Sequence, residues 1–332
     1  MAEVGYICRL AFGNNKMGKS DLIIIGGGPA GLTAGLYAAR GMMDVTLLRS
    51  GTPVCQATTT DDIHNYPGFP GGIGGPELIK RMEEQATSFG LTILDRHVQS
   101  IAPNDAGFEI ATDRGACEAR TLLIATGAVP RSVGVPGEKE FRGRGVSYCA
   151  TCDGAFFTDT PIAVIGGGDA AVKEAIYLTR FASKVYLVHR RNTFRAEPVL
   201  VRHAAENSKI EFVLDSVVKE IHGDEIVDSV IVRNVKSGEE GRLEVEGVFV
   251  FTGIQPNSEI VSDIVQMDER GFIIADREMA TSCPGIYAAG DVCRKSLRQI
   301  VTAVADGAIA VESIEKYLSN EELRNSPASQ VA

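Results

Sequence analysis

Two stretches of the sequence decide the fold of this chain: Leu22–Gly31, which reads LIIIGGGPAG, and Ile162–Ala171, which reads IAVIGGGDAA. Each joins a short apolar run to three glycines and then to helix-forming residues. Such an apolar run is typical of a strand that is buried on both faces of a parallel sheet. The glycines fit the pattern in which a tight turn brings backbone close to a pyrophosphate at a helix N-terminus. The sequence therefore predicts two dinucleotide-binding units.

Each stretch continues into a strand–helix–strand unit, so the chain carries an internal duplication. The predicted fold class is α/β, with two Rossmann-like dinucleotide-binding domains. In the two units, helices are expected over Ala30–Arg40 and Ala170–Arg180, and the next strands over Val45–Leu48 and Val185–Val188. Elsewhere, helices are expected over Pro76–Phe89 and Ile300–Leu318, and strands near Thr92–Ile93, Phe108–Ala111, Leu122–Ala125, Ile210–Leu214, Ser229–Val235 and Val248–Phe251.

The second strand of each unit ends in residues that bear on nucleotide choice. In the first unit, Arg49-Ser50 stand where an acid would be expected to bind a ribose. In the second unit the strand ends in His189-Arg190-Arg191, with Arg195 close by. Arginines at this place suit the 2′-phosphate of NADP, whereas a solvated basic loop is the alternative.

The segment Cys149–Gly154, which reads CATCDG, is the predicted chemical centre. A C-x-x-C pair near a βαβ unit favours a redox dithiol. A structural zinc site would need four ligands, and no second pair lies nearby in the sequence. The other alternative is that the two cysteines are buried thiols that take no part in the chemistry. Asp153 either stabilises the turn or donates and accepts protons for thiol and flavin.

A second acidic position, Gly290-Asp291, closes the strand-like run that begins at Gly285. Such an acid is suited to binding the sugar hydroxyls of a cofactor, although an Asp in a turn explains it equally well. No metal site is predicted, because the spacing of the histidines in the sequence fits no pattern of metal ligands. Besides His189, the histidines are His64, His97, His203 and His222.

Composition excludes several classes of protein. The 33 Lys and Arg against 43 Asp and Glu give a net charge of −10, which argues against nucleic-acid binding. No segment approaches the roughly 20 apolar residues of a membrane span. Seven scattered cysteines do not resemble a secreted disulfide framework, so a cytoplasmic protein is expected. The ends of the chain, residues 1–19 and 319–332, are expected to be flexible.

Taken together, these residues resemble the low-molecular-weight, bacterial-type NADPH-dependent thioredoxin reductase family. The resemblance covers nearly everything from Leu22 to Leu318. The dithiol motif in front of a second dinucleotide fold is the most specific feature. The segments that carry the resemblance are Gly26–Gly31, Thr58–Thr60, Asn65–Gly68, Ala125–Gly127, Cys149–Gly154, Gly166–Ala171, His189–Glu197, Thr252-Gly253, Pro256-Asn257, Gly285–Val292 and Arg298-Gln299.

The resemblance implies FAD on the first fold, NADPH on the second, and a redox disulfide between Cys149 and Cys152. It implies that the second domain is inserted into the first, with an FAD-binding domain formed by residues 20–128 and 255–318 and an NADPH-binding domain formed by residues 129–254. Electrons would pass from NADPH to FAD, then to the disulfide and finally to thioredoxin, in a homodimer. Reduction of another small dithiol protein, use of another electron donor, or a flavin-bound thiol sensor are the alternatives.

The resemblance also implies site residues. The catalytic residues are Cys149, Cys152 and Asp153. The FAD site is expected to comprise Gly26, Gly28, Pro29, Ala30, Gly31, Gln56, Asn65, Thr126, Gly127, Gly290, Asp291, Arg298 and Gln299. The NADPH site is expected to comprise Gly166, Gly168, Asp169, Ala170, Ala171, His189, Arg190, Arg191 and Arg195.

Two further expectations follow. Val54-Cys55 replace the two glycines that usually precede Gln56 in a loop that touches the flavin, and we interpret Cys55 as a small residue tolerated in a shifted loop. The dithiol and the nicotinamide site are also expected on the same inserted domain. The chain passes between the two domains near Thr126–Arg131 and Thr252–Pro256. The inserted domain should rotate about these two places, presenting first the dithiol and then the nicotinamide site to the flavin, or the reverse.

Overall fold

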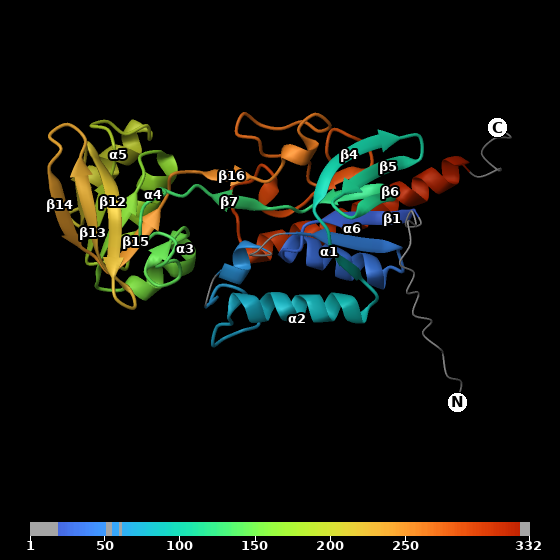
Figure 1. Cartoon of the computed structure of the whole chain (residues 1–332), viewed down its shortest axis with the longest axis horizontal. Helices are drawn as coiled ribbons and strands as arrows, with labels where there is room; N and C mark the ends of the chain where they lie inside the picture. The colour runs from blue at the N-terminus through green and yellow to red at the C-terminus, as the bar shows by residue number, and fades with distance from the viewer. Residues whose placement is uncertain (1–18, 51–54, 60–61, 326–332) are drawn as a thin grey trace.

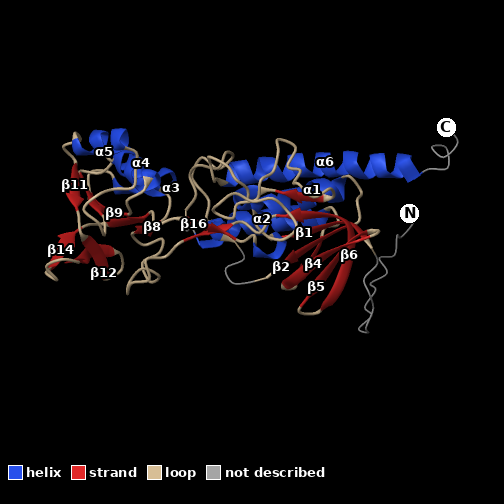
Figure 2. Ribbon diagram, turned by 90° about the horizontal axis from the view of Figure 1, so that it is seen from above, coloured by secondary structure: helices blue, strands red, loops and turns tan. Residues whose placement is uncertain are grey.

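The computed structural model describes residues 19–50, 55–59 and 62–325 of the chain. These residues form two α/β bodies that lie end to end along the long axis of the molecule (Figure 1; Figure 2). The N-terminal and C-terminal parts of the described chain form the first body, and the middle of the chain forms the second. None of the described helices is long and apolar enough to cross a membrane.

A seven-stranded sheet organises the first body. Its strands are β1 (Ser20–Ile25), β2 (Val45–Arg49), β3 (Thr92–Asp95), β4 (Val98–Asn104), β5 (Gly107–Thr112), β6 (Gly115–Ile124) and β17 (Ile286–Ala288). They run in the order β3-β2-β1-β6-β5-β4, with β17 paired to β6. Strands β1, β2, β3, β6 and β17 pair in parallel, so the carboxyl ends of β1, β6 and β17 meet at one edge. Strands β4 and β5 are antiparallel additions.

Both faces of this sheet are covered, which explains the continuous apolar run of β1. Leu22 and Ile24 face one core, together with residues of helices α1 (Pro29–Arg40), α2 (Gly75–Ser88) and α6 (Ile300–Asn325). Ile23 and Ile25 face a second core, which the β4–β5 hairpin and the segment around η3 (Glu259–Val261) complete. Full burial of each such side chain contributes about 1.5–3 kcal/mol.

The second body repeats the design on a smaller scale. A parallel sheet runs in the order β11-β10-β9-β15-β8, and an antiparallel sheet runs in the order β12-β13-β14. Helices α4 and α5 pack on one face of the parallel sheet, and the antiparallel sheet packs on the other. The elements are β8 (Val146–Ser147), α3 (Ala150–Asp153), η2 (Gly154–Phe157), β9 (Pro161–Ile165), α4 (Asp169–Leu178), β10 (Lys184–Val188), α5 (Pro198–Ala205), β11 (Ile210–Val213), β12 (Ser216–Gly223), β13 (Val227–Asn234), β14 (Glu240–Glu244) and β15 (Gly247–Val250).

A two-stranded ribbon carries the chain between the bodies (Figure 1). Strand β7 (Ala128–Pro130) leaves the first body, and β16 (Ile254–Pro256) returns to it, paired antiparallel to β7. Each strand follows a Thr-Gly pair whose glycine has a positive φ, 71° at Gly127 and 127° at Gly253. A side chain would be strained at these positions, so glycine is required where the chain turns into the ribbon.

The duplicated strand–helix–strand units are confirmed, each within a few residues of the predicted bounds. The end predicted for the last helix at Leu318 is wrong, because α6 continues to Asn325. Glu321 on this extension forms an ion pair with Arg120 of β6, at 3.6 Å between Oε2 and Nη2. Residues 1–19 and 319–332 were expected to be flexible; of these, 1–18 and 326–332 lie outside the described residues, whereas 319–325 belong to α6, so the expectation is wrong for them.

Candidate active site

At the first glycine turn, the backbone that follows β1 lies directly against the backbone that follows β6. A Cβ at Gly26, where φ is 124°, would lie 2.2 Å from the carbonyl oxygen of Ala125. A Cβ at Gly31 would lie 2.0 Å from the carbonyl oxygen of Gly26. Helix α1 then begins at Pro29 with Gly28 as its N-cap and no side-chain cap. The first N–H groups of this 12-residue helix are thus without a capping side chain, as a pyrophosphate site requires.

The acidic segment after β17 lies beside this turn. A Cβ at Gly290 would lie 3.0 Å from the Cβ of Ala30. The neighbouring Asp291 has a buried Oδ1 atom without a hydrogen-bond partner among the described residues. Burial raises the pKa of Asp291, while the charges of Lys295 and Arg298 oppose that shift. An unpaired buried oxygen at this position fits a hydroxyl group of a bound cofactor, so the residues present are suited to FAD.

Asp306, which the sequence did not single out, and Arg298, which was predicted for the FAD site, hold the Asp291 loop. Asp306 of α6 accepts a hydrogen bond from the backbone N–H of Gly290 at 2.9 Å, and it also pairs with Lys295. Arg298 donates to the carbonyl oxygens of Asp291 at 3.3 Å and of Cys293 at 3.2 Å. The Arg298 guanidinium is therefore engaged with the backbone of the Asp291 loop.

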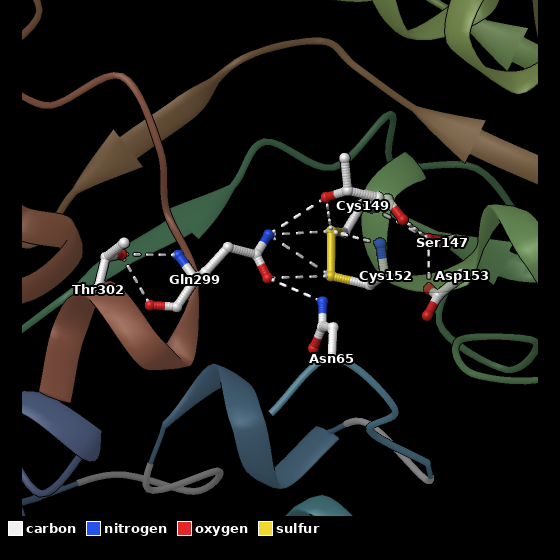
Figure 3. The surroundings of a disulfide bond; sticks show 8 residues. Asn65, Ser147, Cys149, Cys152, Asp153, Gln299 and Thr302 are labelled. Carbon is white, nitrogen blue, oxygen red and sulfur yellow. Dashed lines mark hydrogen bonds between the residues drawn. A yellow bond between two sulfur atoms is a disulfide. The ribbon is translucent and has the colours of Figure 1, made fainter. Parts of the chain in front are cut away.

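The predicted dithiol is a disulfide between Cys149 and Cys152, with their Cα atoms 5.3 Å apart. Cys149 caps the short helix α3, because its sulfur accepts the N–H of Cys152 at 3.2 Å. Gln299 reaches the disulfide from the first body, with its Nε2 atom 3.7 Å from Cys149 Sγ and 3.8 Å from Cys152 Sγ. Asn65 donates to Gln299 Oε1 at 3.0 Å (Figure 3). Of the residues predicted for the cofactor site, Gln299 thus contacts the disulfide, and Asn65 is hydrogen-bonded to Gln299.

On the other side of the disulfide, Asp153 is held by Ser147 (Figure 3). Ser147 Oγ donates to Asp153 Oδ2 at 2.6 Å and accepts the N–H of Cys149 at 3.0 Å. Burial raises the pKa of Asp153, and the hydrogen bond from Ser147 opposes that shift. A carboxyl group with a raised pKa next to a disulfide can hold a proton and release it. Ser147 was missed, although its place two residues before Cys149 was visible in the sequence.

The second glycine turn forms a similar cradle in the second body. A Cβ at Gly166 would lie 2.6 Å from the carbonyl oxygen of Phe251, whereas one at Gly168 would meet open space. The loop after β10 closes over the turn, because the N–H of Arg195 donates to the carbonyl oxygen of Gly167 at 2.8 Å. Asp169 is engaged with the same loop, since its Oδ1 accepts the N–H of Glu197 at 2.8 Å.

The three arginines of this loop have exposed side chains without a hydrogen bond or ion pair to the described residues. The ring of His189 stacks on Phe194 with centroids 5.2 Å apart. Burial lowers the pKa of His189, and the positive charges of Arg191, Arg190 and Arg195 lower it further. A cluster of unpaired guanidinium groups at a strand end is suited to a phosphate.

Cys55 lies against the first glycine turn, with its Cβ 3.3 Å from the position of a Cβ at Gly28. Burial raises the pKa of Cys55, so this thiol stays protonated at neutral pH. Val54, the other departure from the family pattern, lies outside the described residues. No cluster suited to a metal ion occurs among the residues for which the structure gives positions.

Two dinucleotide folds with a disulfide held at their junction define a disulfide reductase that works with a flavin and a nicotinamide nucleotide. The chain belongs to the pyridine nucleotide-disulphide oxidoreductase family, which it matches over residues 20–307, and within that family to the thioredoxin reductases. Members use FAD and NADPH, as predicted.

Individual relatives can be aligned with almost the whole chain. Thioredoxin reductase of Bacillus subtilis is 44% identical, over 92% of this chain and 96% of that protein. The crystal structure of thioredoxin reductase from Streptococcus pyogenes has a TM-score of 0.88 at 48% identity, covering 91% of this chain and 99% of that one. Lactococcus lactis thioredoxin reductase in its FR conformation has a TM-score of 0.62 at 45% identity, covering 91% of this chain and 100% of that one.

Proposed function

We propose that this chain catalyses the NADPH-dependent reduction of the disulfide of thioredoxin. The observation that carries the proposal is the Cys149–Cys152 disulfide, which the second body presents to Gln299 of the first. The Bacillus subtilis relative bears the name thioredoxin reductase, and a relative from Mycobacterium leprae is named bifunctional thioredoxin reductase/thioredoxin. A small protein with a redox disulfide is therefore the proposed partner.

FAD held by the first glycine turn and Asp291 would supply the two-electron chemistry that links NADPH to the disulfide. The side chains of this protein do the rest. The glycine turns and the N-termini of α1 and α4 bind pyrophosphates, and Asp291 accepts a hydrogen bond from a sugar hydroxyl. Breaking the Cys149–Cys152 bond with two electrons yields two sulfur anions, and Asp153 supplies a proton to one of them. The resulting dithiol then reduces a partner disulfide by thiolate exchange.

The domain limits and the assembly are part of the proposal. Residues 20–128 and 255–318 would form the FAD-binding domain, and residues 129–254 the NADPH-binding domain that carries the dithiol; the sheet order supports this division. We further propose a homodimer in the cytoplasm. The exposed apolar side chains of Val301 and Ile309 on α6 support a protein contact there. Sedimentation analysis of the purified protein tests the dimer.

Rotation of one domain against the other is proposed for the catalytic cycle. The disulfide faces the first body here, so the nicotinamide site needs a second arrangement to reach the flavin. The glycines at both ends of the ribbon, Gly127 and Gly253, support a hinge at this place. The two solved relatives also support it, because nearly equal identities go with TM-scores of 0.88 and 0.62.

Locking the two bodies together should stop turnover. The rings of His64 in the first body and Phe156 in the second lie 5.6 Å apart, so a His64→Cys/Phe156→Cys variant offers a pair for a short bis-maleimide. In the linked, oxidised enzyme we expect electron exchange between flavin and disulfide to persist while NADPH no longer reduces the flavin. The untreated variant and the treated wild type are the controls. Normal steady-state turnover of the linked enzyme would show that one arrangement serves both steps.

Bound flavin should be directly visible. Because one FAD site is built from the first glycine turn and Asp291, we expect a yellow protein with a flavin absorption band and one FAD per chain. Asp291→Ala should lose most of the flavin on gel filtration, since it removes the unpaired acceptor. A folded wild-type protein that takes up no added FAD would contradict the proposal.

A further inference from the structure

A charged hydrogen bond joins the two bodies away from the disulfide sulfurs. Nη2 of Arg142, in the second body, donates to Oε1 of Gln56, in the first, at 2.8 Å. Gln56 opens η1 (Gln56–Thr59), the loop that follows Cys55 beside the first glycine turn. Arg142 and Gln56 therefore connect the moving domain to a loop that is expected to touch the flavin.

The second body holds the Arg142 guanidinium in a fixed place. Its Cζ lies 5.0 Å from the ring centroid of Tyr148, the residue immediately before Cys149. The Tyr148 hydroxyl donates to Oε1 of Glu138 at 2.8 Å. Because the Tyr148 ring is held by its hydrogen bond to Glu138, its contact with the Arg142 guanidinium restricts the rotamers of that long side chain. Arg142 thus keeps a constant position relative to the reactive disulfide.

Glu138 connects this cluster to the hinge. Its carboxylate is 1% exposed and accepts the hydroxyl of Ser132 and the backbone N–H groups of Val133 and Gly134, which follow β7. Burial alone would raise the pKa of Glu138, but the donated hydrogen bonds outweigh it and hold the pKa below its usual value. The carboxylate therefore stays ionised, and its hydrogen bonds tie the segment after β7 to Tyr148, which precedes Cys149.

We propose that Arg142 is a positioning residue that holds the disulfide against the flavin site by binding Gln56, and that it must release Gln56 whenever the nicotinamide site takes the place of the disulfide. This inference rests on the proposed domain rotation. A rotation about the ribbon separates residues of different bodies, so the Arg142–Gln56 bond exists in only one arrangement. The bond thereby sets the ratio of the two arrangements.

The size of the effect follows from the kind of bond. A hydrogen bond to a charged group, lost from one of two arrangements, changes their ratio by about tenfold or more. Loss of the bond should favour the arrangement that presents the nicotinamide site. Reduction of flavin by NADPH should then become faster, and electron transfer from flavin to disulfide slower.

A single tryptophan reports the ratio, since the chain contains none. Phe156 of the second body lies against His64 of the first in this arrangement, so a Phe156→Trp reporter changes neighbours when the bodies separate. The FAD-loaded enzyme should show two fluorescence lifetimes, whose amplitudes give the populations. Flavin content and thermal unfolding of each variant are measured in parallel, to exclude loss of cofactor or of structure.

Arg142→Met in the reporter background should shift the amplitude ratio by about tenfold or more. Gln56→Leu, at saturating FAD, should give a similar shift, and the double variant should add nothing to either. Arg144→Met is the matched control. Its guanidinium donates to the carbonyl oxygens of Glu140 at 2.7 Å and Glu225 at 3.1 Å, both in the second body. The control should therefore leave the ratio unchanged.

Two results would overturn the inference in different ways. Two lifetimes whose ratio is the same in the reporter enzyme and in Arg142→Met, or shifts equally in Arg144→Met, would remove the role of Arg142 and leave the rotation intact. A single lifetime in every variant, with and without NADPH, would show that the bodies do not rearrange. That outcome would remove both the role of Arg142 and the proposed rotation.

Discussion

Replacing Cys149 or Cys152 by Ser should abolish reduction of a protein disulfide. Each change leaves a lone thiol, which cannot complete the thiolate exchange that regenerates a disulfide in the enzyme. NADPH should still bleach the flavin absorption band, because hydride transfer does not involve sulfur. The measurement is steady-state reduction of thioredoxin, together with rapid-mixing spectra of the flavin.

Cys283→Ser is the matched control, since Cys283 is a free and partly exposed thiol in the first body. We expect this variant to keep full activity. Full disulfide reductase activity in either Cys149→Ser or Cys152→Ser would contradict the assignment of the redox centre. Loss of flavin bleaching in both would mean that the damage lies in nucleotide binding instead.

Replacing Arg190 and Arg191 together by Gln should lower kcat/KM for NADPH by roughly 10²–10⁴, because each charge-assisted contact with a phosphate contributes about 1.5–3 kcal/mol. The value for NADH should change little, since the pyrophosphate cradle at Gly166–Gly168 is untouched. Initial rates with both nucleotides measure the preference directly.

Arg202→Gln provides the control for charge, because Arg202 is an exposed arginine of α5 in the same body. It should leave both nucleotides unaffected. Equal losses with NADPH and NADH in the double variant would show that the two arginines support the fold of the loop, and the 2′-phosphate assignment would be wrong.

The duplicated fold could be predicted because its signals are local. An apolar strand, a glycine turn and a helix follow each other within a few residues in both units, and the structure confirms them. Short elements such as β7, β8 and β16 escaped prediction. Their residues are fixed by pairing with distant parts of the chain, as Ile254 pairs with Pro130, and no local pattern records that pairing.

The candidate site divides in the same way. The reactive disulfide and the phosphate cradles were visible as motifs, whereas the side chains that support them were not. Asp306, 16 residues after Gly290 in the sequence, holds the Asp291 loop from α6, and Arg142 is hydrogen-bonded to Gln56 across 86 residues of sequence. Gln299 was predicted for the flavin, but its contact with both sulfurs depends on how the two bodies meet.

Catalytic consumption of NADPH in the presence of thioredoxin is the measurement that tests the proposed function most directly. Purified FAD-loaded enzyme is mixed with excess NADPH, and absorbance is followed with and without oxidised thioredoxin. We expect many equivalents of NADPH to be consumed per enzyme only when thioredoxin is present, with an equal number of thioredoxin disulfides reduced. Consumption that stops at about two equivalents per enzyme, one for the FAD and one for the Cys149–Cys152 disulfide, would contradict the account and is the result expected of a flavin-bound thiol sensor.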